Sequence, residues 1–66
     1  MCSPKAFLRQ DGNEILVMED IQSIVWETPT CFVLRDIMGH ARRVEGKIVS
    51  MDLINHHILL EGHVSN

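Results

Sequence analysis

The sequence predicts an all-β protein, a small SH3-like or Sm-like barrel of five to six short antiparallel strands. Two observations support this class. Short runs rich in β-branched and apolar residues recur along the 66 residues, and turn-forming residues separate them. No segment longer than about ten residues keeps a helical apolar period without being interrupted by Gly or Pro. The chain also has no repeat, linker or low-complexity stretch, so residues 1–66 are expected to form a single small β-barrel domain.

The first half of the chain reads as a hairpin followed by two further strands. Asp11-Gly12-Asn13 is a strong tight-turn signal, because Gly adopts positive φ without steric penalty. Pro29 lacks the N–H that a strand ladder needs, so the third run ends before it. Extended runs are expected over residues 5–9, 14–18, 21–27 and 31–35.

The second half is expected to contain one long extended segment and a final short one. Residues 36–40 include Gly39 and are expected to turn. Residues 41–50 form the long segment, in which Gly46 suits a kink or bulge. A turn over residues 52–55 then leads into the last run, residues 57–61.

Nine apolar residues are the predicted core, and Trp26 is assigned either to the core or to a dimer interface. The core set is Val17, Ile24, Val25, Phe32, Leu34, Ile48, Leu53, Ile58 and Leu60.

Composition narrows the range of partners. Hydrophobic residues make up 45% of a chain too short to bury a large core, which favours a homodimer. The formal charge is −3 and aromatic residues are few, which argues against nucleic acid as a partner. No apolar run approaches the roughly 18 residues of a membrane span, and no signal peptide is visible. We therefore expect a cytoplasmic protein with reduced cysteines and no membrane association.

Cys2 is the strongest candidate for chemistry. Its thiolate lies close in sequence to the α-amine and to backbone amide nitrogens, and five-membered chelate rings can form through Met1 or through Ser3, depending on whether Met1 is removed. Nitrogen and sulfur donors in a plane suit Ni(II) or Cu(II). Pro4 has no N–H, so the chelate cannot continue there and the remaining donor must come from elsewhere, such as a second copy of the chain.

Other residues carry weaker signals. A Cys2–Cys31 disulfide is the structural alternative for both thiols, although Cys31 fits a small buried hydrophobe in an apolar strand better. The histidines at positions 40, 56, 57 and 63 could add nitrogen donors, but their spacing matches no closed zinc site. No pairing of Cys31 with a histidine is favoured by spacing, and no phosphate-binding loop is present, so we do not expect an enzyme.

Two stretches carry a family resemblance: Met-Cys-Ser-Pro-Lys-Ala-Phe-Leu at positions 1–8 and Val-Glu-Gly-Lys-Ile-Val-Ser-Met-Asp-Leu-Ile-Asn-His-His-Ile-Leu-Leu-Glu at positions 44–61. Together they resemble the CooT-type small nickel-binding proteins. The resemblance implies an all-β homodimer that binds Ni(II) through Cys2, and a role in nickel delivery to carbon monoxide dehydrogenase. The rival hypothesis is a small RNA-binding or protein-interaction barrel without metal, which would depend on basic residues and tolerate Cys2→Ser.

Overall fold

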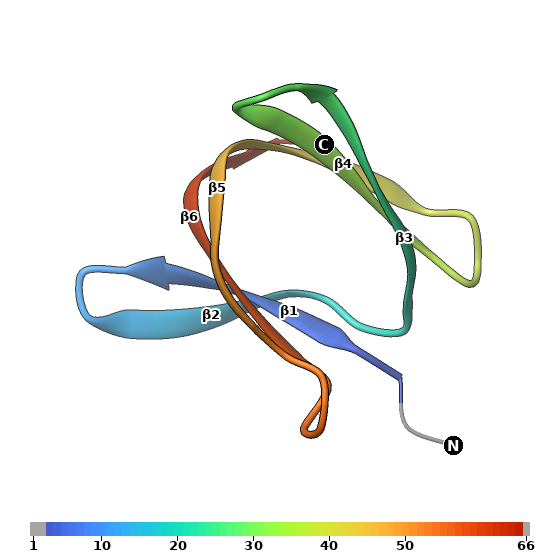
Figure 1. The fold of residues 1–66 in the computed structure, drawn as a ribbon, viewed down its shortest axis with the longest axis horizontal. Helices are drawn as coiled ribbons and strands as arrows, with labels where there is room; N and C mark the ends of the chain where they lie inside the picture. Colours follow the sequence, from blue (N-terminus) through green and yellow to red (C-terminus); the bar gives the residue numbers. More distant parts are fainter. Residues whose placement is uncertain (1–2, 66) are drawn as a thin grey trace.

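A computed structural model describes residues 3–65 of the chain (Figure 1). The expected all-β class is confirmed, and the strands begin and end within a few residues of the predicted runs. The six strands are β1 (Lys5–Gln10), β2 (Asn13–Met18), β3 (Ile21–Thr28), β4 (Cys31–Asp36), β5 (Ala41–Asp52) and β6 (His57–Ser65).

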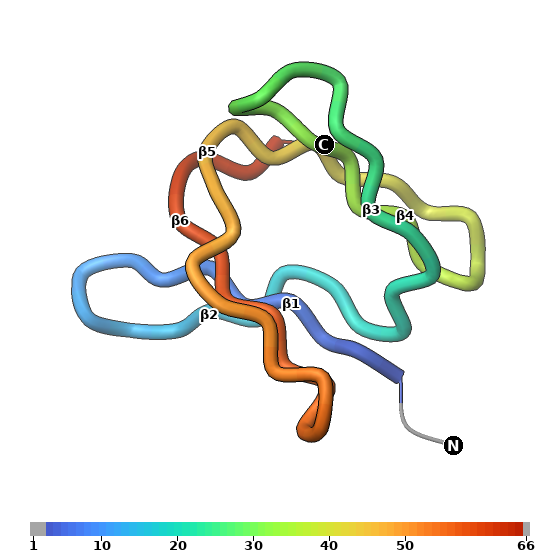
Figure 2. Tube along the Cα trace, in the orientation of Figure 1, coloured from blue at the N-terminus to red at the C-terminus, as the bar shows by residue number. Residues whose placement is uncertain are grey.

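The strands form one sheet in the order β2-β1-β6-β5-β4-β3. β5 and β6 run side by side around the curve of this strongly coiled sheet (Figures 1 and 2). Over residues 3–65 the pairing order leaves β2 and β3 as edges, so strand pairing does not close the coil into a barrel. All neighbouring pairs are antiparallel except β1 and β6, which are parallel. The β1–β6 pair joins strands far apart in the sequence. The local sequence pattern of each strand does not reveal whether the two strands run parallel or antiparallel.

The turns follow the residues that favour them. Asp11 and Gly12 take positive φ values of 52° and 80° in the β1–β2 hairpin, as the tight-turn signal predicts. Asp36 closes the β4–β5 turn by accepting hydrogen bonds from the backbone N–H groups of Met38 and His40. The bulge in β5 lies between Ile48 and Ser50 rather than at Gly46, which is paired in register.

The core lies on the inner face of the coil. Its buried residues are Ala6, Met18, Ile21, Phe32, Leu34, Val44, Ile58 and Leu60. Val17, Ile24 and Ile48, three of the predicted core residues, are only partly buried and pack against it.

Two predicted core residues are wrong. Val25 is 57% exposed because it pairs with Val33, which alternates with the buried Phe32 and Leu34 and so lies on the opposite face of the sheet. Leu53 is 75% exposed because it lies in the turn beyond β5. Trp26 is 51% exposed with its ring tilted against Phe32 at a centroid distance of 5.4 Å, so it borders the core without entering it.

The candidate metal-binding end of the sheet

Backbone hydrogen bonds on both sides hold the start of β1. The N–H of Lys5 donates to the carbonyl of His56 at 2.9 Å, which attaches β1 to the residue before β6. The N–H of Ile21 donates to the carbonyl of Pro4 at 3.1 Å, which attaches the same segment to β3. The N-terminal segment therefore bridges two strands that are distant in the sheet order. Ser3 is half-buried, and the predicted ligands Met1 and Cys2 lie outside the described residues.

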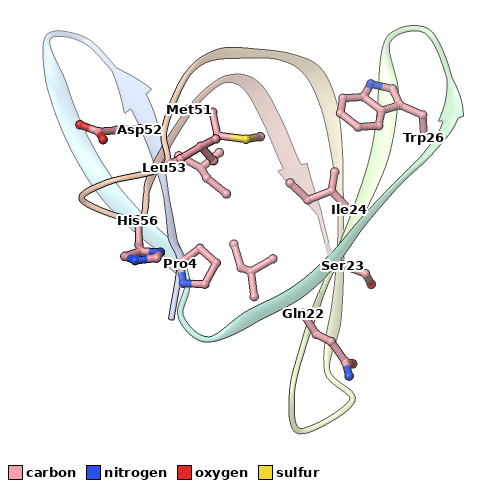
Figure 3. A pocket seen from close by; sticks show the side chains of 11 residues that line it. Pro4, Gln22, Ser23, Ile24, Trp26, Met51, Asp52, Leu53 and His56 are labelled. Atoms are coloured by element: carbon pink, nitrogen blue, oxygen red, sulfur yellow. The ribbon is translucent and has the colours of Figure 1, made fainter. Parts of the chain in front are cut away.

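An apolar hollow of about 350 Å³ opens beside this segment. Pro4 forms one wall, β3 contributes Ile24 and Trp26, and the end of β5 contributes Met51 (Figure 3). Asp52 and His56 are its ionisable lining residues, and Figure 3 shows the imidazole of His56 beside the Pro4 ring. A second hollow, of about 410 Å³, is lined by Ser3, Lys5, Ile54, Asn55 and His56. His56 borders both.

The β5–β6 turn beside these hollows is fixed by the Asp52 carboxylate. Asp52 Oδ1 accepts hydrogen bonds from the N–H groups of Ile54 and Asn55, each at 3.0 Å, and its Oδ2 accepts from Asn55 Nδ2 at 2.8 Å. The bonds from Asn55 are the main reason that the pKa of Asp52 lies below its usual value. The turn ends at His56, whose φ of 55° is a left-handed conformation for a non-glycine residue.

The four histidines occupy different surroundings. His40 lies in the β4–β5 turn with Nδ1 at 3.1 Å from Asp36 Oδ2. His57 pairs with Glu14 at 3.1 Å and stacks on Phe7 with ring centroids 4.5 Å apart. His63 lies within strand β6, where it pairs with Glu45 of β5, and its side chain is exposed. The ring of His56 has no hydrogen-bond, ion-pair or stacking partner among residues 3–65. The sequence did not distinguish these histidines, because their differences come from long-range pairing.

Cys31 is remote from the N-terminal end. It is a free, half-buried cysteine at the start of β4, and its thiol lies 3.8 Å from Glu27 Oε1. It is thus less buried than a core hydrophobe. The β3–β4 hairpin that carries it and the start of β1 lie at opposite ends of the view in Figure 1. Within residues 3–65, the His, Cys, Asp and Glu side chains form no group of three that could hold a metal ion.

Most basic side chains have partners within the fold. Arg43 Nη2 lies 2.8 Å from Glu27 Oε1, and Arg42 Nη1 donates to the Val17 carbonyl at 3.0 Å. Arg9 Nε donates to Glu61 at 2.9 Å, and Lys47 Nζ lies 3.8 Å from the same carboxylate. Among residues 3–65, no helix is long and apolar enough to cross a membrane.

This architecture places the chain among small all-β proteins built on one coiled sheet, with an anchored N-terminal segment beside an apolar hollow. A family model described as CO dehydrogenase accessory protein CooT matches residues 1–61. The chain therefore belongs to the CooT family of carbon monoxide dehydrogenase accessory proteins, as the two sequence stretches indicated.

Two individual proteins are similar to this chain. A crystal structure provisionally assigned as CooT from Carboxydothermus hydrogenoformans superposes with a TM-score of 0.81 and 29% identity, covering 94% of this chain and 98% of that one. An uncharacterized protein of Archaeoglobus fulgidus is 47% identical over 45 residues, which are 68% of this chain and 98% of the relative. The first supports the coiled sheet as the shared fold.

Proposed function

We propose that this protein is a cytoplasmic nickel chaperone or store that binds Ni(II) through Cys2 and supplies a nickel enzyme such as carbon monoxide dehydrogenase. It performs no catalysis itself in this proposal. The observation that carries it is the family match over residues 1–61, which includes the Met1-Cys2 end. The backbone bonds that hold Pro4 and Lys5 support it, because they give the segment after the proposed ligands a fixed position.

The donor chemistry of this end fits the cargo. A Cys2 thiolate with nitrogen donors from Met1 or Ser3 forms five-membered chelate rings, a mixed set that suits planar Ni(II). The thiol loses its proton on binding, so affinity falls as the pH decreases. Pro4 lacks an N–H, and its carbonyl already accepts the hydrogen bond from Ile21. The proposed chelate therefore stays within the first three residues.

A homodimer would complete the site. A two-fold axis repeats the same N-terminal segment, so two Cys2 residues near that axis share one ion. Large apolar side chains lie exposed around this end: Trp26 and Met51 border the apolar hollow, and Ile54, in the β5–β6 turn, is 88% exposed. Burying them against a second copy would remove apolar surface from water. These exposed residues support a dimer interface next to Ser3 and Pro4, the residues that follow the proposed Cys2 ligand in the sequence.

The test is an anaerobic Ni(II) titration of untagged, reduced protein, followed by absorbance. The wild type is expected to develop thiolate-to-nickel charge-transfer bands that saturate at about one ion per two chains. Cys2→Ser should lose them. Cys31→Ser is the matched control and should keep them, because Cys31 lies in the remote β3–β4 hairpin. If neither the wild type nor Cys31→Ser binds nickel, the proposal fails and an interaction barrel without metal becomes the better account.

A further inference from the structure

We propose that the open edge of β2 binds an extended, basic segment of a partner protein, which joins the sheet as a further strand. The surface lies on the β1–β2 hairpin, which projects from the coil (Figure 1), and it contains none of the proposed nickel ligands. Partner binding at this edge and nickel binding can therefore be tested separately.

β2 is the less covered of the two edge strands. β3, the other edge, is already joined at its start by the N-terminal segment, because the N–H of Ile21 donates to the Pro4 carbonyl. Within the described chain, β2 has β1 as its only strand neighbour. Its open stretch ends at Val17, where the register is interrupted and the carbonyl accepts a hydrogen bond from Arg42. Residues 13–16 are therefore the part of β2 that a new strand can join.

The backbone of this stretch has hydrogen-bonding groups that β1 does not use. The β1–β2 turn has two residues with positive φ, so Gln10 and Asn13 on either side of it form a hydrogen-bonded pair. Bonded and non-bonded pairs alternate along an antiparallel ladder, so Glu14 and Leu16 turn their N–H and C=O groups away from β1. An extended peptide pairs with such outward groups when it adds to the edge of a sheet.

Two apolar side chains on this stretch are left uncovered. Ile15 is 49% exposed and Leu16 is 45% exposed, and as neighbours in a strand they point to opposite faces of the sheet. The strand also lacks Lys and Pro, the residues that commonly protect an exposed edge from pairing. An added strand would cover part of both side chains with its own apolar residues.

The charges around the edge select a basic partner. The sequence has no Lys, Arg or His between Arg9 and Arg35, and four exposed carboxylates of this interval flank or occupy β2: Asp11, Glu14, Glu19 and Asp20. Glu14 pairs with His57, whereas the other three have no hydrogen-bond or ion-pair partner within the described chain. Pairing two copies of this edge would bring like charges together, so a chain that carries Lys or Arg beside its apolar residues is the better match.

The test uses the whole wild-type chain and three short peptides. The first peptide, acetyl-Lys-Lys-Val-Ile-Val-Lys-Lys-amide, has apolar residues at its centre and basic residues at both ends. In the second peptide Glu replaces each Lys. In the third peptide Pro replaces the central Ile, which removes a backbone N–H and disfavours an added strand.

Binding is followed by amide NMR of the protein. We expect the first peptide alone to bind, with the largest shifts and the strongest slowing of hydrogen exchange at the Glu14 and Leu16 amides. Its affinity should fall as the salt concentration rises, because exposed charges are screened.

Two variants with the same added charge locate the surface. Leu16→Lys places a cation on β2, and we expect it to weaken binding of the first peptide at least about tenfold, because a like charge then faces the peptide. Val25→Lys makes the same change on β3, where Val25 is 57% exposed, and should bind as the wild type does. Circular dichroism checks that both variants are folded, and the peptide comparison on the wild type does not depend on them.

Several results would overturn this assignment. Equal binding of the Ile and Pro peptides would indicate charge attraction without strand addition, and equal binding of the Glu peptide would remove the role of the carboxylates. Loss of binding in Val25→Lys but not in Leu16→Lys would move the surface to β3. If millimolar peptide shifts no β2 amide, the edge does not take this partner. Broadening of the β2 amides when the protein alone is concentrated would then show that a second copy covers the edge.

Discussion

Gly46 on β5 lies directly opposite Gly62 on β6, and neither position has room for a side chain. A Cβ on Gly46 would lie 2.0 Å from the carbonyl oxygen of Glu61, and one on Gly62 would lie 2.1 Å from that of Glu45. Both obstacles are backbone atoms, which cannot rotate away. The two strands thus meet backbone to backbone at this pair, within the β5–β6 ladder that runs around the coil (Figures 1 and 2).

Gly62→Ala is expected to destabilise the fold by about 3 kcal/mol, because relieving the clash with Glu45 requires the β5–β6 pair to separate locally. Gly12→Ala is the control, since Gly12 also has positive φ but meets nothing within 4 Å. It should lose only about 1 kcal/mol from backbone strain. Urea denaturation followed by circular dichroism measures both. Equal losses would show that φ, rather than the close approach, governs the position.

Phe32→Ala is expected to unfold most of the protein. Phe32 is fully buried, and removing such a ring costs about 3–5 kcal/mol, comparable to the whole stability of a chain this size. Leu53→Ala removes another large apolar side chain, but from an exposed turn, so its effect should stay within about 0.5 kcal/mol. Thermal unfolding of the two variants provides the comparison. A large loss in Leu53→Ala would mean that this side chain is buried in solution, for example against a second copy.

The protein is expected to lose stability as the pH falls below about 4. The pKa of Asp52 is lowered from its usual value of 3.8, mainly by hydrogen bonds from Asn55. The pKa of Glu61 is lowered from 4.5, mainly by the Arg9 side chain. A carboxyl whose folded pKa is depressed stabilises the fold above its unfolded pKa, and that contribution disappears as pH falls through the folded pKa.

Urea midpoints measured from pH 6 down to about pH 2.5 test this expectation. The wild-type midpoint should stay level near neutral pH and then drop. In Asp52→Asn the drop in the midpoint at low pH should be shallower, because one titrating carboxyl is gone. The midpoint at neutral pH should be lower, because the turn has lost one carboxylate acceptor. A wild-type urea midpoint that rises as the pH is lowered would contradict the predicted loss of stability in acid.

Ile54→Ser should weaken the proposed dimer without unfolding the chain. Ile54 is 88% exposed in the β5–β6 turn beside the second hollow. In the proposed dimer, a second copy of the chain would cover this side chain. Ile15→Ser, on the edge strand β2, replaces a half-exposed apolar residue elsewhere and serves as the control. Sedimentation velocity over a concentration series measures both. If Ile15→Ser dissociates the dimer and Ile54→Ser does not, the interface lies along β2 instead.

Local chemistry made most of the fold predictable. Turn residues such as Gly12, Pro29 and Gly39 divided the chain into the observed strands, because a turn is decided by its own residues. Burial was harder to predict. Leu53 and Val25 looked like core residues, yet Leu53 lies in a turn and Val25 lies on the face of β3 that points away from the core. Ala6 was overlooked because it is small, although it is fully buried.

The candidate site could be predicted only where its ligands are neighbours in the sequence. Cys2 was singled out from its position beside the α-amine. The nearness of His56 to Pro4 and Lys5 depends on the parallel β1–β6 pair, which joins residues separated by nearly the whole chain. Sequence periodicity contains no sign of such a pairing, so the four histidines could be ranked only with the fold in hand.

The parallel β1–β6 pair also decides when the proposed metal end can exist. During synthesis β1 is made first and β6 is the last strand of the sheet to emerge, so the residues after Ser3 have no β6 ladder to join until almost all of the described chain is available. An unfinished or C-terminally clipped chain would retain Cys2 but lack the partner that fixes Pro4 and Lys5 in place. If the proposed site is shared between two folded chains, it would therefore be complete only in molecules whose β6 has joined the sheet.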